Sequence, residues 1–306
     1  MRTRRLAAPL LTAVTALVAV LATALAACSS PAPEQSAPVT VRTTASETAP
    51  PVTKMLVFVV ENHSLAQMRS GMPWVARLAD RYGYTTRYRA ITHPSLPNYL
   101  AIAGGSTFGV TDDQPPAAHP VRRPSVFGQA VAAGSTATIY AEGMTSNCRL
   151  TDTGRYAVRH NPWTYFRRER ADCRAHDVPL SQLADDISAG SLPAVGMVVP
   201  DVCNDAHDCS LGRANAWLRS QVGAVLDGSD FTSGRLAVVI TADEDDRHHG
   251  NRVLTVVAHP DLHHRVVTRR LTHYALSRSY AEVAGIDPLG HARTARSLLG
   301  AFGLTG

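Results

Sequence analysis

The stretch MLVFVV, residues 55–60, is followed at once by Glu61 and Asn62. A short, continuous run of apolar, strand-forming residues is typical of a β-strand that is buried on both faces. Strands of this kind belong to parallel sheets that carry helices on both sides. The polar pair falls where the strand would end, which makes Glu61 and Asn62 the first candidates for functional residues.

Runs of the same type recur along the chain. They are AVGMVV at residues 194–199, LAVVIT at 236–241 and RVLTVVA at 252–258, with a weaker run, TATIY, at 136–140. Helical patterns lie between the runs, and several end in glycine, as helices often do. These patterns are PWVARLADRYG, SVFGQAVAAG, PLSQLADDISAG, RANAWLRSQVGAVLDG and THYALSRSYAEVAG. The alternation predicts an α/β fold, a three-layer sandwich with a mostly parallel central sheet flanked by helices.

Residues 1–27 have the layout of a secretory signal peptide, with a basic start, an apolar stretch and the sequence Leu25-Ala26-Ala27 directly before Cys28. This ending resembles a bacterial lipobox, in which the cysteine becomes the lipidated first residue of the mature protein. A transmembrane anchor is the alternative, but the change to serine and proline after Cys28 argues against it. We therefore expect an exported protein that is lipid-anchored at the bacterial cell envelope through Cys28.

The mature chain divides into a tether and a domain. Residues 28–52 are rich in proline, alanine, serine and threonine and lack an apolar period, so we expect an extended tether. Residues 53–306 are long enough for one α/β domain with a large core, the expected catalytic domain. The formal net charge of +5 falls to about +2 without the three leader arginines, which is too weak to indicate a nucleic acid partner.

Four cysteines follow the lipobox, and an even number in an exported chain predicts two disulfides. Three pairings are possible. We favour Cys148 with Cys173 and Cys203 with Cys209, because each pair closes a short loop. A zinc site is the alternative, but no pair has the two-residue spacing of a zinc knuckle.

Acidic residues follow three of the predicted strands: Glu61 after the first, Asp201 after AVGMVV, and Asp243 with Glu244 after LAVVIT. Ligands of mostly parallel sheets bind beyond the carboxyl ends of the strands. Carboxylates gathered there repel one another unless a cation neutralises them, so this edge is a candidate metal site. For any one of these residues alone, a turn is the simpler explanation, because aspartate is common in turns.

A helix start is predicted in ITHPSLPNYLAIAGG, residues 91–105, with Ser95 at or near the cap. Pro97 fits a first helical turn, where its missing N–H costs nothing. Serine is an ordinary capping residue. A hydroxyl at a helix N-terminus, however, also faces free N–H groups, which suits a nucleophile that attacks a phosphate.

Five ordered motifs resemble those of the bacterial phosphoesterase family, which includes acid phosphatases and phosphatidylcholine-type phospholipases C, within the alkaline phosphatase superfamily. The motifs are FVVENHS, HPSLPNYLAIAGG, VPDVCNDAHDCS, ITADEDD and LTHYALSRS. Together they span about residues 55 to 285, nearly the whole predicted domain. The resemblance implies an alkaline phosphatase-like fold.

By the same resemblance, a metal ion is held by Glu61 and Asn62 from the first strand and by Asp243 and Glu244 from the opposite side. Ser95 is implied to be both a metal ligand and the nucleophile, which forms a phosphoseryl intermediate. A metal with oxygen ligands would lower the pKa of the hydroxyl and polarise a phosphoryl oxygen.

Further residues are expected to contact the substrate or transfer protons. Asn98, one turn into the helix, can direct its amide at the phosphate, and His93 flanks the same motif. His207 and His273 match family histidines near the site, and either could protonate the leaving group. Asp205 is expected to act as a further ligand, to bind near the substrate, or to orient His207.

One divalent ion is expected, because Asp243 and Glu244 stand where the two-zinc members of the superfamily carry Asp-His. Its identity is open among Mg, Ca, Mn and Zn.

The favoured function is an acid phosphatase-like phosphomonoesterase with a small phosphorylated substrate. A phospholipase C-type diesterase that acts on a phospholipid head group is the alternative. The short chain after the last motif favours the monoesterase. An inactive, lipid-anchored binding protein is the third reading, and the presence of Ser95 and of all the acids argues against it. Membrane contact is expected only through the lipid anchor.

Overall fold

The computed structural model describes residues 51–305. The predictions for the signal peptide, for lipidated Cys28 and for nearly all of the tether lie outside these residues. No helix among the described residues is both long and apolar enough to cross a lipid bilayer.

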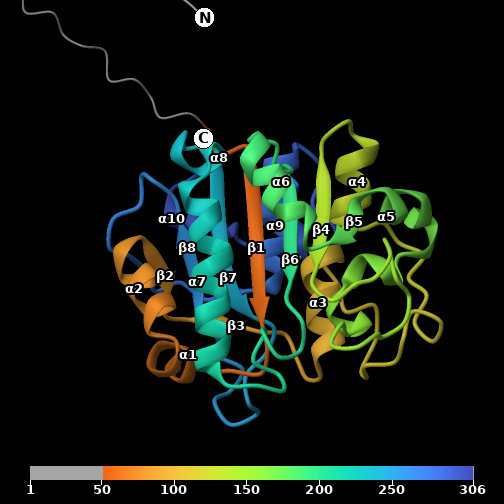
Figure 1. Cartoon of the computed structure of the whole chain (residues 1–306), viewed down its shortest axis with the longest axis horizontal. Coiled ribbons are helices and arrows are strands. Elements are labelled where there is room, and N and C mark those ends of the chain that lie inside the picture. The colour runs from red at the N-terminus through yellow and green to blue at the C-terminus, as the bar shows by residue number, and fades with distance from the viewer. Residues whose placement is uncertain (1–50, 306) are drawn as a thin grey trace, which may run out of the picture. The chain divides into compact units, whose positions relative to one another are not determined.

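An eight-stranded sheet forms the centre of the domain, with strands in the order β5-β4-β6-β1-β7-β8-β2-β9 (Figure 1). The strands are β1 (Lys54–Val60), β2 (Gly83–Thr85), β4 (Ala137–Ala141), β5 (Asp177–Pro179), β6 (Val195–Val199), β7 (Leu236–Ala242), β8 (Thr255–Ala258) and β9 (Arg265–Val267). A separate two-stranded parallel sheet pairs β3 (Tyr88–Arg89) with β10 (Leu271–Thr272). The mostly parallel sheet predicted from the sequence is confirmed.

The strand β8 is the exception within the central sheet. It runs antiparallel to both of its neighbours, β7 and β2, whereas all the other pairings in this sheet are parallel. The apolar run at 252–258 has the same composition as the parallel strands. Composition depends on burial on both faces of the sheet, and it does not depend on the direction in which the strand runs.

Helices cover both faces of the sheet, and Figure 1 shows α7 in front of it and α9 behind. The first group, which packs around α7, is α1 (Leu65–Gly71), α2 (Pro73–Arg81), α6 (Gln182–Ala189), α7 (Leu211–Asp227) and α8 (Ser229–Thr232). The second group, connected through α9, is α3 (Ser95–Gly104), α4 (Val126–Ala132), α5 (Arg170–His176), α9 (His273–Ala284) and α10 (Leu298–Phe302). Short 3-10 turns are η1 (Val158–His160), η2 (Pro162–Tyr165), η3 (Arg167–Glu169) and η4 (Gly290–Arg293).

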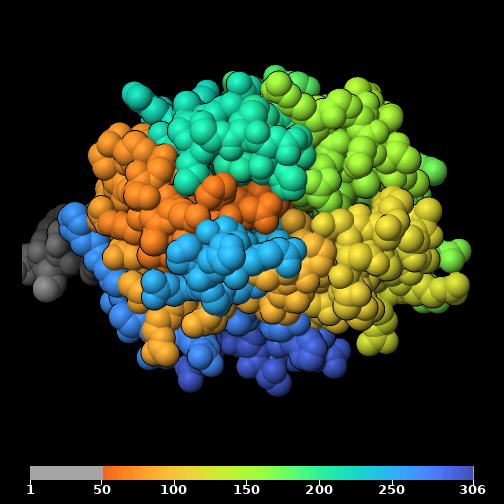
Figure 2. Space-filling model, turned by 90° about the horizontal axis from the view of Figure 1, so that it is seen from below, coloured from red at the N-terminus to blue at the C-terminus, as the bar shows by residue number. Residues whose placement is uncertain are grey.

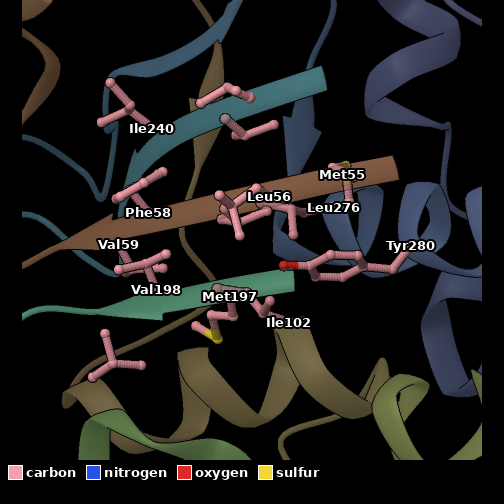
Figure 3. Close-up of a cluster of buried hydrophobic side chains, with 14 of the residues drawn as sticks. Met55, Leu56, Phe58, Val59, Ile102, Met197, Val198, Ile240, Leu276 and Tyr280 are labelled. Carbon is pink, nitrogen blue, oxygen red and sulfur yellow. The ribbon is translucent and has the colours of Figure 1, made fainter. Parts of the chain in front are cut away.

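The main core lies where the central strands meet α3 and α9 (Figure 3). Phe58 of β1 is in register with Val198 of β6 and with Ile240 of β7. The Tyr280 hydroxyl of α9 donates a 2.6 Å hydrogen bond to the Gly196 carbonyl of β6. Every residue of α3 is buried, so the start of this helix is held firmly against the sheet.

Both predicted disulfides are present, Cys148 with Cys173 and Cys203 with Cys209. The first ties the chain after β4 to α5, and the second closes the loop after β6. Because all four sulfur atoms are used in these bonds, the alternative of a cysteine zinc site is wrong. Disulfides of this kind are typical of domains that fold outside the cytoplasm.

The carboxyl ends of β1, β6 and β7 point to one edge of the sheet, at the bottom of Figure 1, where α3 also begins. Figure 2 views the molecule from that side and shows the blue segment that follows β7 beside the orange segment that follows β1. Backbone hydrogen bonds join these two segments, from the Asp243 N–H to the Val60 carbonyl and from the Leu65 N–H to the Arg252 carbonyl.

Candidate active site

Two carboxylates meet where β1 and β7 end. The two strands pair in parallel with Val60 opposite Ala242, which places the next residues, Glu61 and Asp243, side by side. Both are fully buried. The backbone N–H of Asn62 donates to Asp243 Oδ1 at 3.1 Å, and its side-chain amide donates to Glu61 Oε2 at 3.1 Å.

Ser95 is the first residue of α3, as the position of Pro97 predicted. Its side chain is nearly buried, and its hydroxyl donates to Glu61 Oε2 at 3.1 Å. The N–H of the next residue, Leu96, is occupied by Asp113 Oδ1 at 2.9 Å. The Ser95 hydroxyl therefore lies at the N-terminal end of a buried helix and points toward the cluster of carboxylates.

Asn98 joins the loop before Ser95 to the acidic group. Its side-chain oxygen accepts hydrogen bonds from the N–H groups of Ile91 and Thr92. Its amide nitrogen donates to Glu244 Oε2 at 3.0 Å and also contacts the carbonyls of Thr92 and Pro94. Asn98 was predicted to bind substrate, and the structure shows it holding this loop and Glu244 together.

His93 lies at the rim of the same group. Its Nδ1 is 3.0 Å from Glu244 Oε1, and its Nε2 is 3.3 Å from Asp245 Oδ1. Burial lowers the pKa of His93, and the nearby charge of Arg247 lowers it further, against the opposing effect of Asp245. The ring is partly exposed, so it lines the approach to the acids.

His160 is a central residue of the site that sequence reasoning missed. It is buried in η1, with Nε2 2.9 Å from Glu61 Oε1 and Nδ1 3.2 Å from Asp205 Oδ2. The ring stacks on Tyr99 of α3 with 5.2 Å between centroids. Burial on its own would lower the pKa of His160, but the two carboxylates raise it to about 9.

No strand end precedes His160, because η1 lies in the long connection between β4 and β5. The one available signal is its neighbourhood, AVRHNPWTYF at residues 157–166, in which polar residues interrupt an apolar stretch that fits neither a helix nor a strand. Such a stretch is buried without regular structure, so its polar residues must find partners.

Asp205 orients His160 and anchors the predicted acid His207. One carboxylate oxygen faces the His160 ring, and the other accepts the backbone N–H of His207 at 2.7 Å. The His207 ring lies 5.9 Å from the His160 ring, and its Nδ1 contacts Asp208 Oδ1 at 2.6 Å. The acid Asp201, by contrast, forms a turn by accepting the N–H groups of Cys203 and Asn204.

His273, the other predicted catalytic histidine, lies behind Asp243. Its Nε2 is 2.6 Å from the backbone carbonyl of Asp243, and its Nδ1 is 3.2 Å from the Tyr88 hydroxyl. Burial lowers the pKa of His273 to about 4, so the ring is neutral. Because both nitrogens have partners, the structure gives His273 a position that supports the end of β7.

The donor set fits a divalent cation. Asp243 Oδ2 is buried without a hydrogen-bond partner, and Glu61 Oε1 and Asp205 Oδ2 have only the His160 ring beside them. Burial, together with the charge of Glu61, raises the pKa of Asp243 well above its usual range and that of Glu244 to about 8. A cation would relieve this repulsion, and carboxylate, amide and hydroxyl oxygens are suitable ligands for it.

A second group of potential ligands shares Glu61 with this set. Glu61, His160 and Asp205 offer atoms that all lie within 4.8 Å of one another. Burial on its own would raise the pKa of Glu61, but His160 lowers it to about 2, so the carboxylate is ionised.

The domain is an α/β sandwich with a serine beside buried acids at the C-terminal edge of its sheet, an architecture of the alkaline phosphatase type. Solved structures support the fold. A member of the alkaline phosphatase superfamily from Vibrio parahaemolyticus superposes with a TM-score of 0.57 at 10% identity, covering 82% of this chain and 70% of that one. A phosphonate monoester hydrolase from Silicibacter pomeroyi gives a TM-score of 0.53 at 11% identity, covering 83% and 77%.

Residues 52–261 match the Phosphoesterase family, and the chain belongs to that family of hydrolases. A phosphatidylinositol-3-phosphatase of Mycobacterium tuberculosis is 28% identical over 85% of this chain and 86% of its own length. A phosphate-repressible acid phosphatase of Penicillium chrysogenum is 30% identical over 71% of this chain and 55% of its own length. The chain thus spans about half the length of this fungal relative.

Proposed function

We propose that the protein is a metal-dependent phosphomonoesterase that acts through a phosphoseryl intermediate on Ser95. The observation that supports this most directly is the Ser95 hydroxyl at the start of α3, hydrogen-bonded to Glu61 within a group of buried carboxylates. One divalent ion would be held by Glu61, Asn62, Asp243, Glu244 and Ser95. When bound, it would neutralise the acids and favour the ionised form of the serine hydroxyl.

The reaction has two displacements. The Ser95 oxygen attacks phosphorus, the bond between phosphorus and the ester oxygen breaks, and the departing alcohol takes up a proton. Water then attacks phosphorus, the bond between phosphorus and the Ser95 oxygen breaks, and inorganic phosphate leaves while a proton from the water goes to Ser95.

Histidine side chains surround this centre and supply the proton transfers. His160 contacts Glu61 directly, and the more exposed His207 ring lies beyond it, on the side where we place the leaving group. We assign the proton donor role to His207, and we assign to His160 the task of holding Glu61 and the phosphate in position.

The substrate class follows from the relatives as a proposal. The names of the relatives point to monoester substrates, which include the head groups of phosphoinositides. Export with a lipid anchor at Cys28 would place such an enzyme outside the cytoplasm, close to lipid substrates.

The decisive experiment compares hydrolysis of p-nitrophenyl phosphate and p-nitrophenylphosphorylcholine, before and after chelation and with Mg, Ca, Mn or Zn added back. Chelator-sensitive cleavage of the monoester is expected. A preference for the choline diester would favour the phospholipase C reading instead.

The matched variants are Ser95→Ala and, as a control, Ser146→Ala, which alters an exposed serine. Loss of turnover in the first variant alone is expected, with unchanged circular dichroism. Full activity of Ser95→Ala would refute the assigned nucleophile.

A further inference from the structure

The Arg159 side chain makes an unusual contact at the edge of the site. It precedes His160 in η1, and its Nη2 lies 3.2 Å from His207 Nε2. Among the described residues, Arg69, Arg235 and Arg278 form ion pairs with carboxylates, whereas Arg159 and the other arginines form none. Arg159 is half-buried, so its charge is held close to the site without a partner of opposite sign.

This contact also determines which nitrogen of His207 carries a proton. A guanidinium group can only donate hydrogen bonds, so His207 Nε2 accepts from Arg159. The proton of the neutral ring is then on Nδ1, where Asp208 accepts it. In this arrangement Arg159 covers the nitrogen that would have to protonate a leaving group.

Arg159 reaches the reacting atoms only through other side chains. The His207 ring is 5.9 Å from the His160 ring, which contacts Glu61, which in turn accepts the Ser95 hydroxyl. The guanidinium therefore lies beyond His207 and His160 as seen from Ser95, at a distance from the atoms that react.

We propose that Arg159 recognises a second anionic group of the substrate, a carboxylate or a further phosphate, a few bonds away from the scissile phosphate. This inference rests on the proposed phosphatase function and narrows its substrate class. A planar guanidinium binds carboxylate and phosphate groups through paired hydrogen bonds. Binding of that anion would draw Arg159 away from His207 Nε2 and leave this nitrogen uncovered.

The test uses two pairs of phosphomonoesters that differ in one anionic group. Glycerol 3-phosphate is compared with 3-phosphoglycerate, which adds a carboxylate, and fructose 6-phosphate with fructose 1,6-bisphosphate, which adds a phosphate. Release of inorganic phosphate is measured for the metal-loaded protein and for the variants Arg159→Met and Arg159→Lys. Arg155→Met is the matched control, because it removes a nearby exposed charge four residues upstream.

In Arg159→Met, kcat/KM for the doubly anionic member of each pair should fall by about tenfold or more, mainly through KM, as expected for a lost hydrogen bond between charged groups. For the singly anionic members kcat/KM should not fall, because they lack the group that Arg159 binds and the substitution only uncovers His207 Nε2. Arg159→Lys should recover part of the loss. An equal fall for both members of a pair, or no fall for either, would overturn the proposal.

Calorimetric binding of the same four compounds separates this inference from the proposed function. If the wild-type protein released phosphate from none of them, the phosphatase proposal would fail. Weaker binding of only the doubly anionic compounds by Arg159→Met would still support the role of Arg159. Identical binding by the wild-type protein and this variant would overturn it.

Discussion

The substitution Asp243→Asn should have two opposite effects. It should stabilise the metal-free protein, and it should weaken the stabilisation that a bound metal ion provides. Asp243 Oδ1 accepts the Asn62 N–H, whereas Oδ2 has no partner and Glu61 lies within hydrogen-bond reach. An asparagine can keep the first contact and donate its amide hydrogen to Glu61. Each unit by which burial and Glu61 raise the pKa of Asp243 costs the folded, metal-free protein about 1.4 kcal/mol, so an uncharged asparagine should stabilise it.

The same change should remove most of the stabilisation by metal. At a concentration one hundred times its Kd, a ligand that binds only the folded protein adds about 2.7 kcal/mol to the free energy of unfolding. For a domain of this size, about 2–4 °C of Tm corresponds to each kcal/mol, so the wild-type Tm should rise by about 5–11 °C. The variant should begin from a higher metal-free Tm and gain less than about 2 °C.

Thermal unfolding followed by circular dichroism, with chelator and then with each metal, measures both effects. Asp287→Asn, which alters an exposed aspartate, is the control and should keep the full metal shift. A wild-type Tm that none of the metals changes, or an Asp243→Asn variant that keeps the full shift, would refute the reasoning.

Three further predictions follow from named contacts. Replacing His160 by glutamine should lower turnover by about 10–100-fold in the phosphate-release assay and should also lower the metal-free Tm, because Glu61 and Asp205 lose the positive charge between them; activity near the wild-type level would exclude its role beside Glu61. Replacing Cys148 and Cys173 together by alanine should lower the free energy of unfolding in urea by about 3 kcal/mol, because this bond closes a loop of 25 residues, and an unchanged midpoint would contradict this. Burial raises the pKa of Asp177 to about 8, so the folded protein keeps a proton that the unfolded chain releases above about pH 4. Stability should therefore fall as the pH rises from about 4 to 8, and Asp177→Asn should flatten that fall; equal slopes of Tm against pH would count against it.

The local sequence was sufficient to predict the strands and the helix that carry the site residues. Buried strands appear as continuous apolar runs, and the placement of a proline behind Ser95 marks a helix start, because both signals depend only on neighbouring residues. The disulfide pairing could also be predicted from the sequence, because each bond closes a short loop. Acids directly after β1 and β7 could be grouped from the sequence because parallel strands end at the same edge.

Only the tertiary structure determined which side chains His160 and His273 contact, because those contacts depend on how distant segments of the chain pack together. His160 comes from an irregular connection far from any strand end, and only the folded chain brings it between Glu61 and Asp205. His273 has the local pattern of a helix start, yet packing directs both of its nitrogens to Asp243 and Tyr88. Periodicity records which side of an element is buried, whereas contacts between distant segments arise from packing, which no local pattern specifies.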